Sequence, residues 1–227
     1  MLYPFDFFLK ICYLFLVMNK KDKDAFISYL GRLFPKAECE LQYSDSFQFL
    51  VAVMLSAQCT DSRVNMVTPK LFEHFSTPSD FANADIVEIE NLIKSCGFYH
   101  NKAKNIKNAS IEIVNRYGGQ LPNTIEELMT LPGVGMKTAK VVCGDLYNVD
   151  VIAVDTHVKR ISNRLGFTNE SDPNKISIQL EHIFREDMSK IHHRLVLFGR
   201  YHCKAQNPSC STCEVKNICK YYKQHKI

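Results

Sequence analysis

Four cysteines near the C-terminal end are spaced so that they could hold a metal: Cys203, Cys210, Cys213 and Cys219. They fall within seventeen residues with no histidine between them, whereas the other five cysteines are scattered along the chain. Four thiolates grouped in this way are typical of a structural zinc site or of an iron–sulfur cluster, and spacing alone does not distinguish the two. Four free buried thiols fit less well, because the segment around them is polar.

A glycine-containing turn, Leu131–Gly135 (LPGVG), is the second candidate site. Its two glycines allow a sharp turn and a close approach of the backbone to a ligand. The N–H groups of Gly133, Val134 and Gly135 stand at the start of an expected helix, whose dipole favours an anion there. We therefore expect a helix-hairpin-helix over about 124–147 that holds a DNA phosphate without reading the sequence. An ordinary tight turn between packed helices is the alternative.

Two charged residues are expected at helix N-termini. Lys137 lies in the first turn of the helix after the hairpin, where the dipole disfavours a positive charge and so favours the nucleophilic free amine. Taken alone, it fits a phosphate contact better than a nucleophile. Asp155, in the run Val154–His157, is expected at or near the next N-cap. Because helix N–H groups keep a carboxylate ionised, it can cap the helix and also stabilise a cationic intermediate.

The elements that must position these residues are expected to be helices. Apolar residues recur at helical spacing in several segments, which are Phe47–Met54, Val64–Phe75, Ile86–Cys96, Ile106–Tyr117, Val158–Leu165 and Ile176–Phe184. Expected N-caps are Thr60, Thr124 and Asp172, and expected helix stops are Gly97, Gly118 and Gly166. No segment alternates with a period of two for long. We predict an all-α fold in which these apolar stripes form the core.

Charge is distributed unevenly along the chain. Lys and Arg number 28 against 24 Asp and Glu, but Met188–Ile227 holds eight basic residues and a single acid, Glu214. This part carries +7 and the rest −3, so the C-terminal part is expected to meet phosphate, although a solvated face around a charged cofactor explains it equally well. With 46% hydrophobic and 23% charged residues, the chain is neither disordered nor fibrous.

The odd number of cysteines, nine, argues against a disulfide framework. The five outside the C-terminal group have apolar neighbours and are expected to be ordinary buried thiols: Cys12, Cys39, Cys59, Cys96 and Cys143.

The first seventeen residues are very apolar but contain Asp6 and Lys10. They are short for a membrane span, and they lack the basic start and the cleavage site of a signal peptide. We expect residues 1–17 to lie outside the fold and translation to begin at Met18. A membrane-associating tail is the alternative.

Together these motifs resemble the endonuclease III family of DNA base-excision glycosylases. The resemblance is carried by motifs in the family's order, which are Leu55–Gln58 (LSAQ) with Thr60–Asp61, Leu131–Gly135 with Lys137–Ala139, Val154–His157, and the cysteine spacing of the family's four-iron cluster loop. It runs from about Met18 to near the C-terminus. It implies a two-lobed helical fold, with a six-helix barrel lobe over 39–149 and an iron–sulfur lobe made of 18–38 and 150–227. It also implies one 4Fe–4S cluster on the four cysteines.

The function that the resemblance implies is that of a bifunctional DNA glycosylase and AP lyase. An oxidised pyrimidine would flip out of the duplex, and Lys137 would displace it at C1′ and form a Schiff base. Asp155 would stabilise the developing positive charge, and β-elimination would cut the strand on the 3′ side. The implied partner is double-stranded DNA with damaged bases or abasic sites. We expect a monomer that works on nucleoid DNA in the cytoplasm and not on a membrane.

The resemblance also implies a set of DNA-binding residues. Gln58 matches the residue that fills the gap left by the flipped base, and Phe98 stands where the family often has leucine as a second wedge. Without the resemblance, Gln58 is a helix-end amide and Phe98 a core aromatic. The remaining members are Gly133, Val134, Gly135, Thr138 and His157, of which the last has no assigned role.

Three other functions compete with this one. Monofunctional mismatch glycosylases resemble the chain less, because they tend to lack lysine at the Lys137 position. A non-catalytic DNA-binding iron–sulfur protein would need neither Lys137 nor Asp155. A zinc-binding relative would be colourless rather than brown.

Two residues or segments depart from the family pattern. The segment Lys204–Ser209 has one basic residue where relatives often have more, which predicts weaker binding to DNA. Cys59 replaces a small residue.

Overall fold

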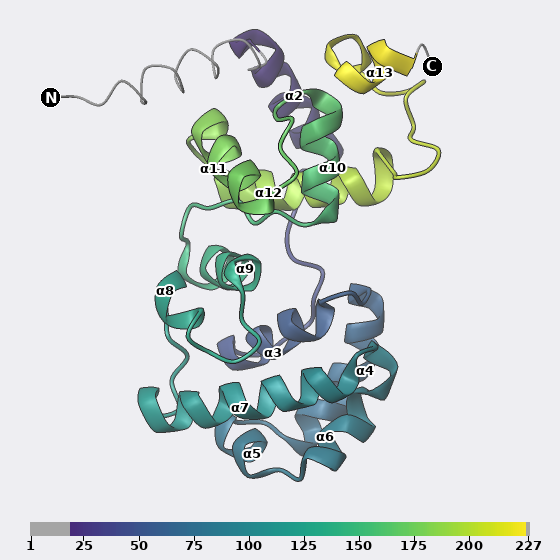
Figure 1. The fold of residues 1–227 in the computed structure, drawn as a ribbon. Helices are drawn as coiled ribbons and strands as arrows, with labels where there is room; N and C mark the ends of the chain where they lie inside the picture. The colour runs from purple at the N-terminus through teal and green to yellow at the C-terminus, as the bar shows by residue number, and fades with distance from the viewer. Residues whose placement is uncertain (1–18, 226–227) are drawn as a thin grey trace, which may run out of the picture. The chain divides into compact units, whose positions relative to one another are not determined.

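The computed structural model describes residues 19–225, so the expectations about residues 1–17 lie outside the described residues. The regular elements of the described range are helices, and no strand forms within it, which confirms the all-α prediction (Figure 1). Within this range no helix is long and apolar enough to cross a membrane.

The described residues divide into two units, each with its own apolar core. The central unit is Cys39–Val149, and the terminal unit comprises the described residues on either side of it. That the units correspond to a six-helix barrel lobe and an iron–sulfur lobe remains a prediction.

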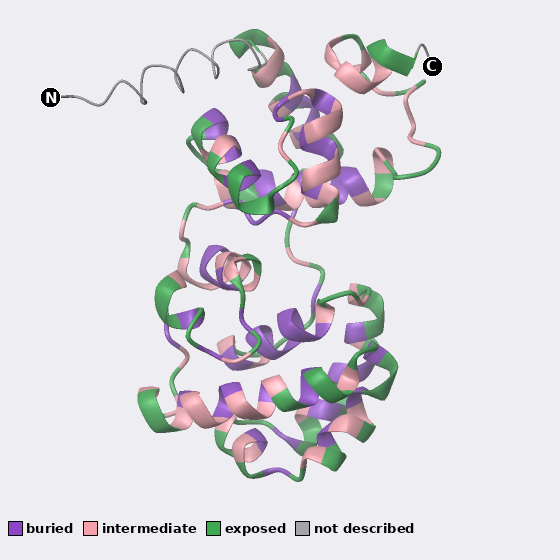
Figure 2. Cartoon of the chain, in the orientation of Figure 1, coloured by how far each residue is buried: buried purple, intermediate pink, exposed green. Residues whose placement is uncertain are grey.

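The central unit is built around α3 (Ser46–Ser56), which contacts α4 (Asp61–His74), α7 (Tyr99–Tyr117) and α9 (Met136–Tyr147). The other elements of this unit are α5 (Pro78–Asn83), α6 (Ile86–Ile93), the 3-10 helix η1 (Lys94–Cys96) and α8 (Ile125–Leu128). The sequence predicted a single apolar stripe on α3. Instead, every residue from Phe49 to Leu55 is buried (Figure 2). The helix thus lies at the centre of the core of its unit and not at the edge of that core.

The terminal unit joins one helix from before Cys39 to the helices after Val149. Its elements are α2 (Lys20–Leu33), α10 (Thr156–Leu165), α11 (Pro173–Phe184), α12 (Met188–Leu197), the π-helix η2 (Phe198–His202), the 3-10 helix η3 (Lys216–Ile218) and α13 (Lys220–His225). Phe26 of α2 is fully buried, and its ring packs against the rings of Phe167 and Phe198. This aromatic group fixes α2 in the core of the unit.

The helix ends follow the expected caps. The side chains of Thr60, Thr124 and Asp172 accept hydrogen bonds from backbone N–H groups at the starts of α4, α8 and α11. Gly118 and Gly166 end α7 and α10 in the left-handed conformation that glycine adopts without strain. These local signals determine where most of the site residues lie along the helices.

Candidate functional site

The hairpin between α8 and α9 packs against α7. Gly133 has φ +79°, and a Cβ on it would lie 2.6 Å from the Cβ of Asn105, so a larger residue does not fit there. Gly135 is different, since it has φ −95° and open space around its Cα. The N–H of Val134 donates to the carbonyl of Leu131 within the turn at 3.1 Å. The N–H groups of Gly133 and Gly135 are therefore better candidates for a phosphate than that of Val134.

The N-terminus of α9 is open toward solvent. Gly135 supplies no side-chain cap, and the first turn contains no acidic residue. The N–H groups of Met136, Lys137 and Thr138 have no acceptor within the helix, as at any helix start. Lys137 itself is exposed. This end of α9 thus offers unpaired N–H donors, a positive dipole end and an accessible amine at one place.

Gln58 and Phe98 both protrude from the central unit in an unusual backbone conformation. Gln58 has φ +53° in the turn between α3 and α4, and Phe98 has φ +48° between η1 and α7. Gln58 is exposed, and Phe98 is 65% exposed, so it is not a core aromatic. Left-handed conformations of non-glycine residues are strained and cluster at functional sites.

Asp155 is the N-cap of α10 in the terminal unit, as expected. Its Oδ1 accepts a hydrogen bond from the N–H of Val158 at 2.7 Å, and the residue is half-buried. One carboxylate oxygen is thus held by the helix, while the group sits at the positive end of the dipole. Lys137 and Asp155 belong to different units.

His157 lies in the first turn of α10, against the π-helix η2. Arg160 has Nη2 3.3 Å from His157 Nδ1, and it donates to the carbonyl of Gly199 at 2.6 Å. A Cβ on Gly199 would lie 2.8 Å from the Cβ of His157, so only glycine allows this approach. His157 thus contacts residues of its own unit, and these contacts account for the position of its side chain without a ligand.

The four C-terminal cysteines line one cavity, together with Arg164 and Tyr221. All four are half-buried free thiols. Within residues 19–225, no three His, Cys, Asp or Glu side chains are arranged to hold a single metal ion. The cysteines thus surround a common space rather than converge on a point.

Burial raises the pKa of the thiols of Cys210, Cys213 and Cys219, and neighbouring cysteines of the group raise it further. Their sulfur atoms are therefore close enough to repel one another as thiolates. Such a group binds protons unless a cation replaces them, which is the condition under which cysteines take up a metal. The donor set fits a metal-containing group that fills the cavity.

Arg164 supports the cysteine loop from α10. Its guanidinium donates to the carbonyls of Lys204 and Ala205 at 2.6 and 2.9 Å and to Cys203 Sγ at 3.4 Å, and it lies over the ring of Tyr221. A cation beside the sulfur atoms stabilises them as thiolates.

The cysteines outside this group are not all buried. Cys96 and Cys143 are buried as expected, but Cys39 and Cys59 are only half-buried, because they lie in loops at the margin of the central core. Cys12 lies outside the described residues. Burial raises the pKa of the Cys96 thiol to about 11, and the adjacent Cys59 adds to the rise.

Two basic residues with structural roles escaped the sequence analysis. Lys102 is 7% exposed in the central unit, and Arg160 links α10 to η2 in the terminal unit. Both stand in helices whose apolar pattern is regular, and nothing in the spacing of their neighbours marks them. Only the backbone carbonyls that face them in the folded chain reveal why Lys102 is buried and Arg160 is half-buried.

Comparisons with known proteins agree on one group. The model of the HhH-GPD superfamily of base excision DNA repair proteins matches residues 51–186. Endonuclease III of Bacillus subtilis strain 168 is 45% identical over 207 residues, which cover 90% of this chain and 94% of that protein. Endonuclease III of Synechocystis is 42% identical over 203 residues, which cover 88% of this chain and 93% of that protein.

Solved structures of endonuclease III also match this chain. A trapped endonuclease III–DNA covalent intermediate matches with a TM-score of 0.89 and 42% identity, over 93% of this chain and all of that chain. A thermostable thymine-DNA glycosylase matches with a TM-score of 0.81 at 22% identity, over 90% of this chain and 98% of that chain, a likeness of fold alone.

Proposed function

We propose that this chain, which belongs to the endonuclease III family within the HhH-GPD superfamily of base excision DNA repair proteins, uses Lys137 as the nucleophile of its reaction. As a member of that family it is a bifunctional enzyme, a DNA glycosylase and AP lyase. A relative at 42% identity has been captured as a covalent DNA intermediate, and such an intermediate requires a nucleophilic side chain. The exposed amine at the open N-terminus of α9 is the observation that carries the assignment.

The DNA backbone is held at the same helix end. A phosphate accepts hydrogen bonds from the N–H groups of Gly133 and Gly135 and meets the positive end of the α9 dipole. Thr138, one residue after the nucleophile, adds a hydroxyl on the same turn. Because phosphate contacts carry no sequence information, the enzyme can engage damage in any sequence context.

The damaged nucleotide, an oxidised pyrimidine, leaves the stack so that its C1′ becomes accessible. Gln58 and Phe98 fill the vacated space, a role that suits two side chains projected into solvent on strained turns. A phenylalanine in this position wedges as a leucine does.

The reaction then proceeds through the amine of Lys137. Its Nζ bonds to C1′ as the glycosidic bond breaks and the base leaves, and the ring-opened sugar becomes a Schiff base. Loss of a proton from C2′ expels the 3′ phosphate and cuts the strand. The Asp155 carboxylate stabilises the cationic species along this path, and its hydrogen bond from the Val158 N–H holds it in place.

The four C-terminal cysteines are proposed to hold one 4Fe–4S cluster. Each cysteine of such a cluster binds a different iron, so the four must surround a space, as Cys203, Cys210, Cys213 and Cys219 do. The cluster would cross-link the loop between η2 and α13. The chemistry at the sugar is assigned to Lys137 and Asp155.

Borohydride trapping tests the central proposal. Reduction converts a Schiff base into a stable protein–DNA adduct, so duplex DNA with one oxidised pyrimidine should become attached to the parent protein. Lys137→Ala should give no adduct, whereas Lys140→Ala, a matched change on the same helix, should still give one. An adduct that persists in Lys137→Ala would disprove the role of Lys137. A brown parent that releases the base but forms no adduct would instead be a monofunctional glycosylase.

A further inference from the structure

One ammonium group is buried in the central unit. Lys102 lies in the first turn of α7 and is only 7% exposed, and its Nζ donates to the carbonyls of Leu55 at 2.8 Å and of Cys96 at 2.7 Å. Lysine is rarely buried to this extent, because the charged group loses its hydration. Burial accordingly lowers the pKa of Lys102. The loss of hydration must therefore be offset by the contacts that the ammonium group makes.

The two carbonyls are the ends of two different helices. Leu55 stands in the last turn of α3, and Cys96 is the last residue of η1. Carbonyls at a helix C-terminus have no partner within the helix, and the dipole there favours a cation. A single ammonium group thus caps α3 and η1 together and fixes the distance between their ends.

The residues that follow these two ends are the proposed wedges. Gln58 comes three residues after Leu55, and Phe98 comes two residues after Cys96. Both have positive φ, a conformation that is strained for an L-residue and persists only where the surroundings enforce it. The thiols of Cys59 and Cys96, one from each turn, are also close enough for Cys59 to raise the pKa of Cys96. The two wedge turns therefore share one buried anchor.

We propose that Lys102 is a positioning residue for the opening of the DNA duplex. It holds the turns of Gln58 and Phe98 at a fixed distance from each other, so that both side chains enter the duplex together. This inference rests on the proposed function, because it assumes that these two side chains fill the space left by the flipped base. Lys102 makes no contact with DNA in this role.

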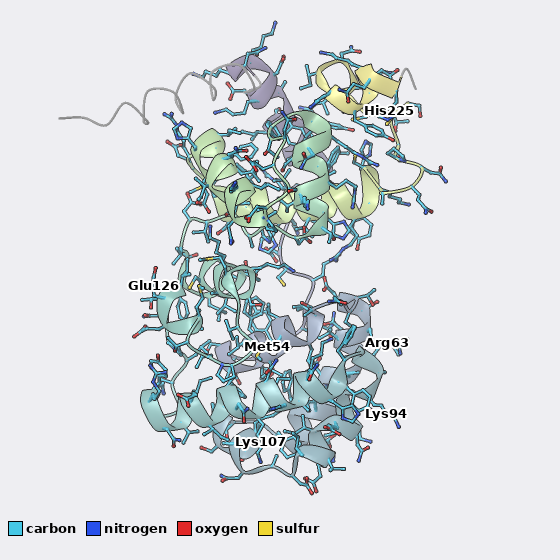
Figure 3. All side chains as sticks on the ribbon, viewed as in Figure 1. Met54, Arg63, Lys94, Lys107, Glu126 and His225 are labelled. Carbon is cyan, nitrogen blue, oxygen red and sulfur yellow. The ribbon has the colours of Figure 1, made fainter. Side chains whose placement is uncertain are left out.

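The same helix offers a matched control. Lys107, which is labelled in Figure 3, lies on α7 and is half-buried, and its Nζ donates to the carbonyl of Ala84, the C-cap of α5. The turn after Ala84 carries no residue proposed to touch DNA. Lys102→Met and Lys107→Met therefore remove the same kind of helix-end contact, but only the first loosens the wedge turns.

The test compares two DNA substrates. An oxidised pyrimidine in paired duplex requires the wedges, whereas an abasic site in a single strand has no stack to open and no gap to fill. Lys102→Met should lower the single-turnover rate on the duplex about tenfold or more and change the lyase rate on the single strand less than about twofold. Lys107→Met should show no such difference between the substrates. Equal loss on both substrates for Lys102→Met, or a duplex-selective loss for Lys107→Met, would overturn the proposal.

A double-mutant cycle shows whether Lys102 acts through the wedges. In a protein that already carries Gln58→Ala and Phe98→Ala, adding Lys102→Met should lower the duplex rate less than about twofold further. An additional loss as large as in the parent background would mean that Lys102 acts elsewhere. If Lys102→Met does not fold, Lys102→Gln, which keeps one donor group, takes its place. A parent protein inactive on both substrates would contradict the proposed function itself, whereas an active parent whose variants fail to discriminate contradicts only this inference.

Discussion

Asp155 caps α10 and is also proposed to act in the reaction, and a change of one side-chain atom can separate the two roles. Asparagine caps helices about as well as aspartate, so Asp155→Asn keeps the acceptor for the Val158 N–H and should change the free energy of unfolding by less than about 0.5 kcal/mol. The variant loses the negative charge, and its single-turnover rate should fall about a hundredfold or more. Chemical denaturation and rapid-quench kinetics measure the two effects.

Asp155→Ala completes this comparison. It removes the cap as well as the charge, so it should destabilise the protein by about 1 kcal/mol and be no more active than Asp155→Asn. An Asp155→Asn protein that keeps its rate within a few-fold would show that the carboxylate serves the helix and not the reaction.

At the scale of residues, the sequence predicts what depends on near neighbours. The caps at Thr60, Asp155 and Asp172 follow from a short polar side chain ahead of an apolar repeat, and the structure places them as expected. The burial of Lys102 could not be predicted, because its partners lie on α3 and η1. The exposure of Cys59 likewise depends on how a loop meets the core.

At the scale of elements, the two hairpin glycines should differ in what they tolerate. Gly133→Ala places a Cβ 2.6 Å from Asn105 at a positive φ, so it should destabilise the protein by about 2 kcal/mol and weaken DNA binding as the turn shifts. Gly135→Ala meets no atom within 4 Å at an ordinary φ, and its stability should stay within about 0.5 kcal/mol of the parent. Thermal melts and binding to abasic duplex measure both. Equal destabilisation by the two changes would contradict this account of the hairpin.

Periodicity predicted the helices but not the place of each in the core. A stripe at Phe47, Leu50, Val51 and Met54 describes one face of α3, whereas the folded chain also buries Phe49, Ala52 and Val53. An amphipathic pattern cannot reveal this, because a helix at the centre of a unit has apolar residues on all sides. The short helix α5 and the π-helix η2 also went unpredicted, since so few residues show no repeat.

At the scale of the whole molecule, one chain builds two separate cores. Among the described residues, the central core draws only on residues from Cys39 to Val149, and the terminal core joins α2 to residues from Ile152 onward. The basic C-terminal part belongs to the terminal unit, and some of its charges are used internally. Arg194 donates to the carbonyl of Phe34, and Lys220 donates to Asn169 Oδ1. The net charge of this part therefore does not show which of its basic side chains can contact DNA directly.

Because the cores are separate, loss of the metal site should weaken one of them selectively. Cys213→Ser removes a proposed cluster ligand next to the buried Val215 of the terminal core, so the protein should lose the brown colour expected of the cluster. Amides of α2, α10 and α13 should then exchange with deuterium faster, whereas those of α3 and α7 should keep their protection, since their core includes none of the four cysteines. Cys39→Ser, a change outside the group, should leave both colour and exchange as in the parent. If exchange in Cys213→Ser rises equally in both units, the two cores unfold as one cooperative structure and the metal site stabilises the entire chain.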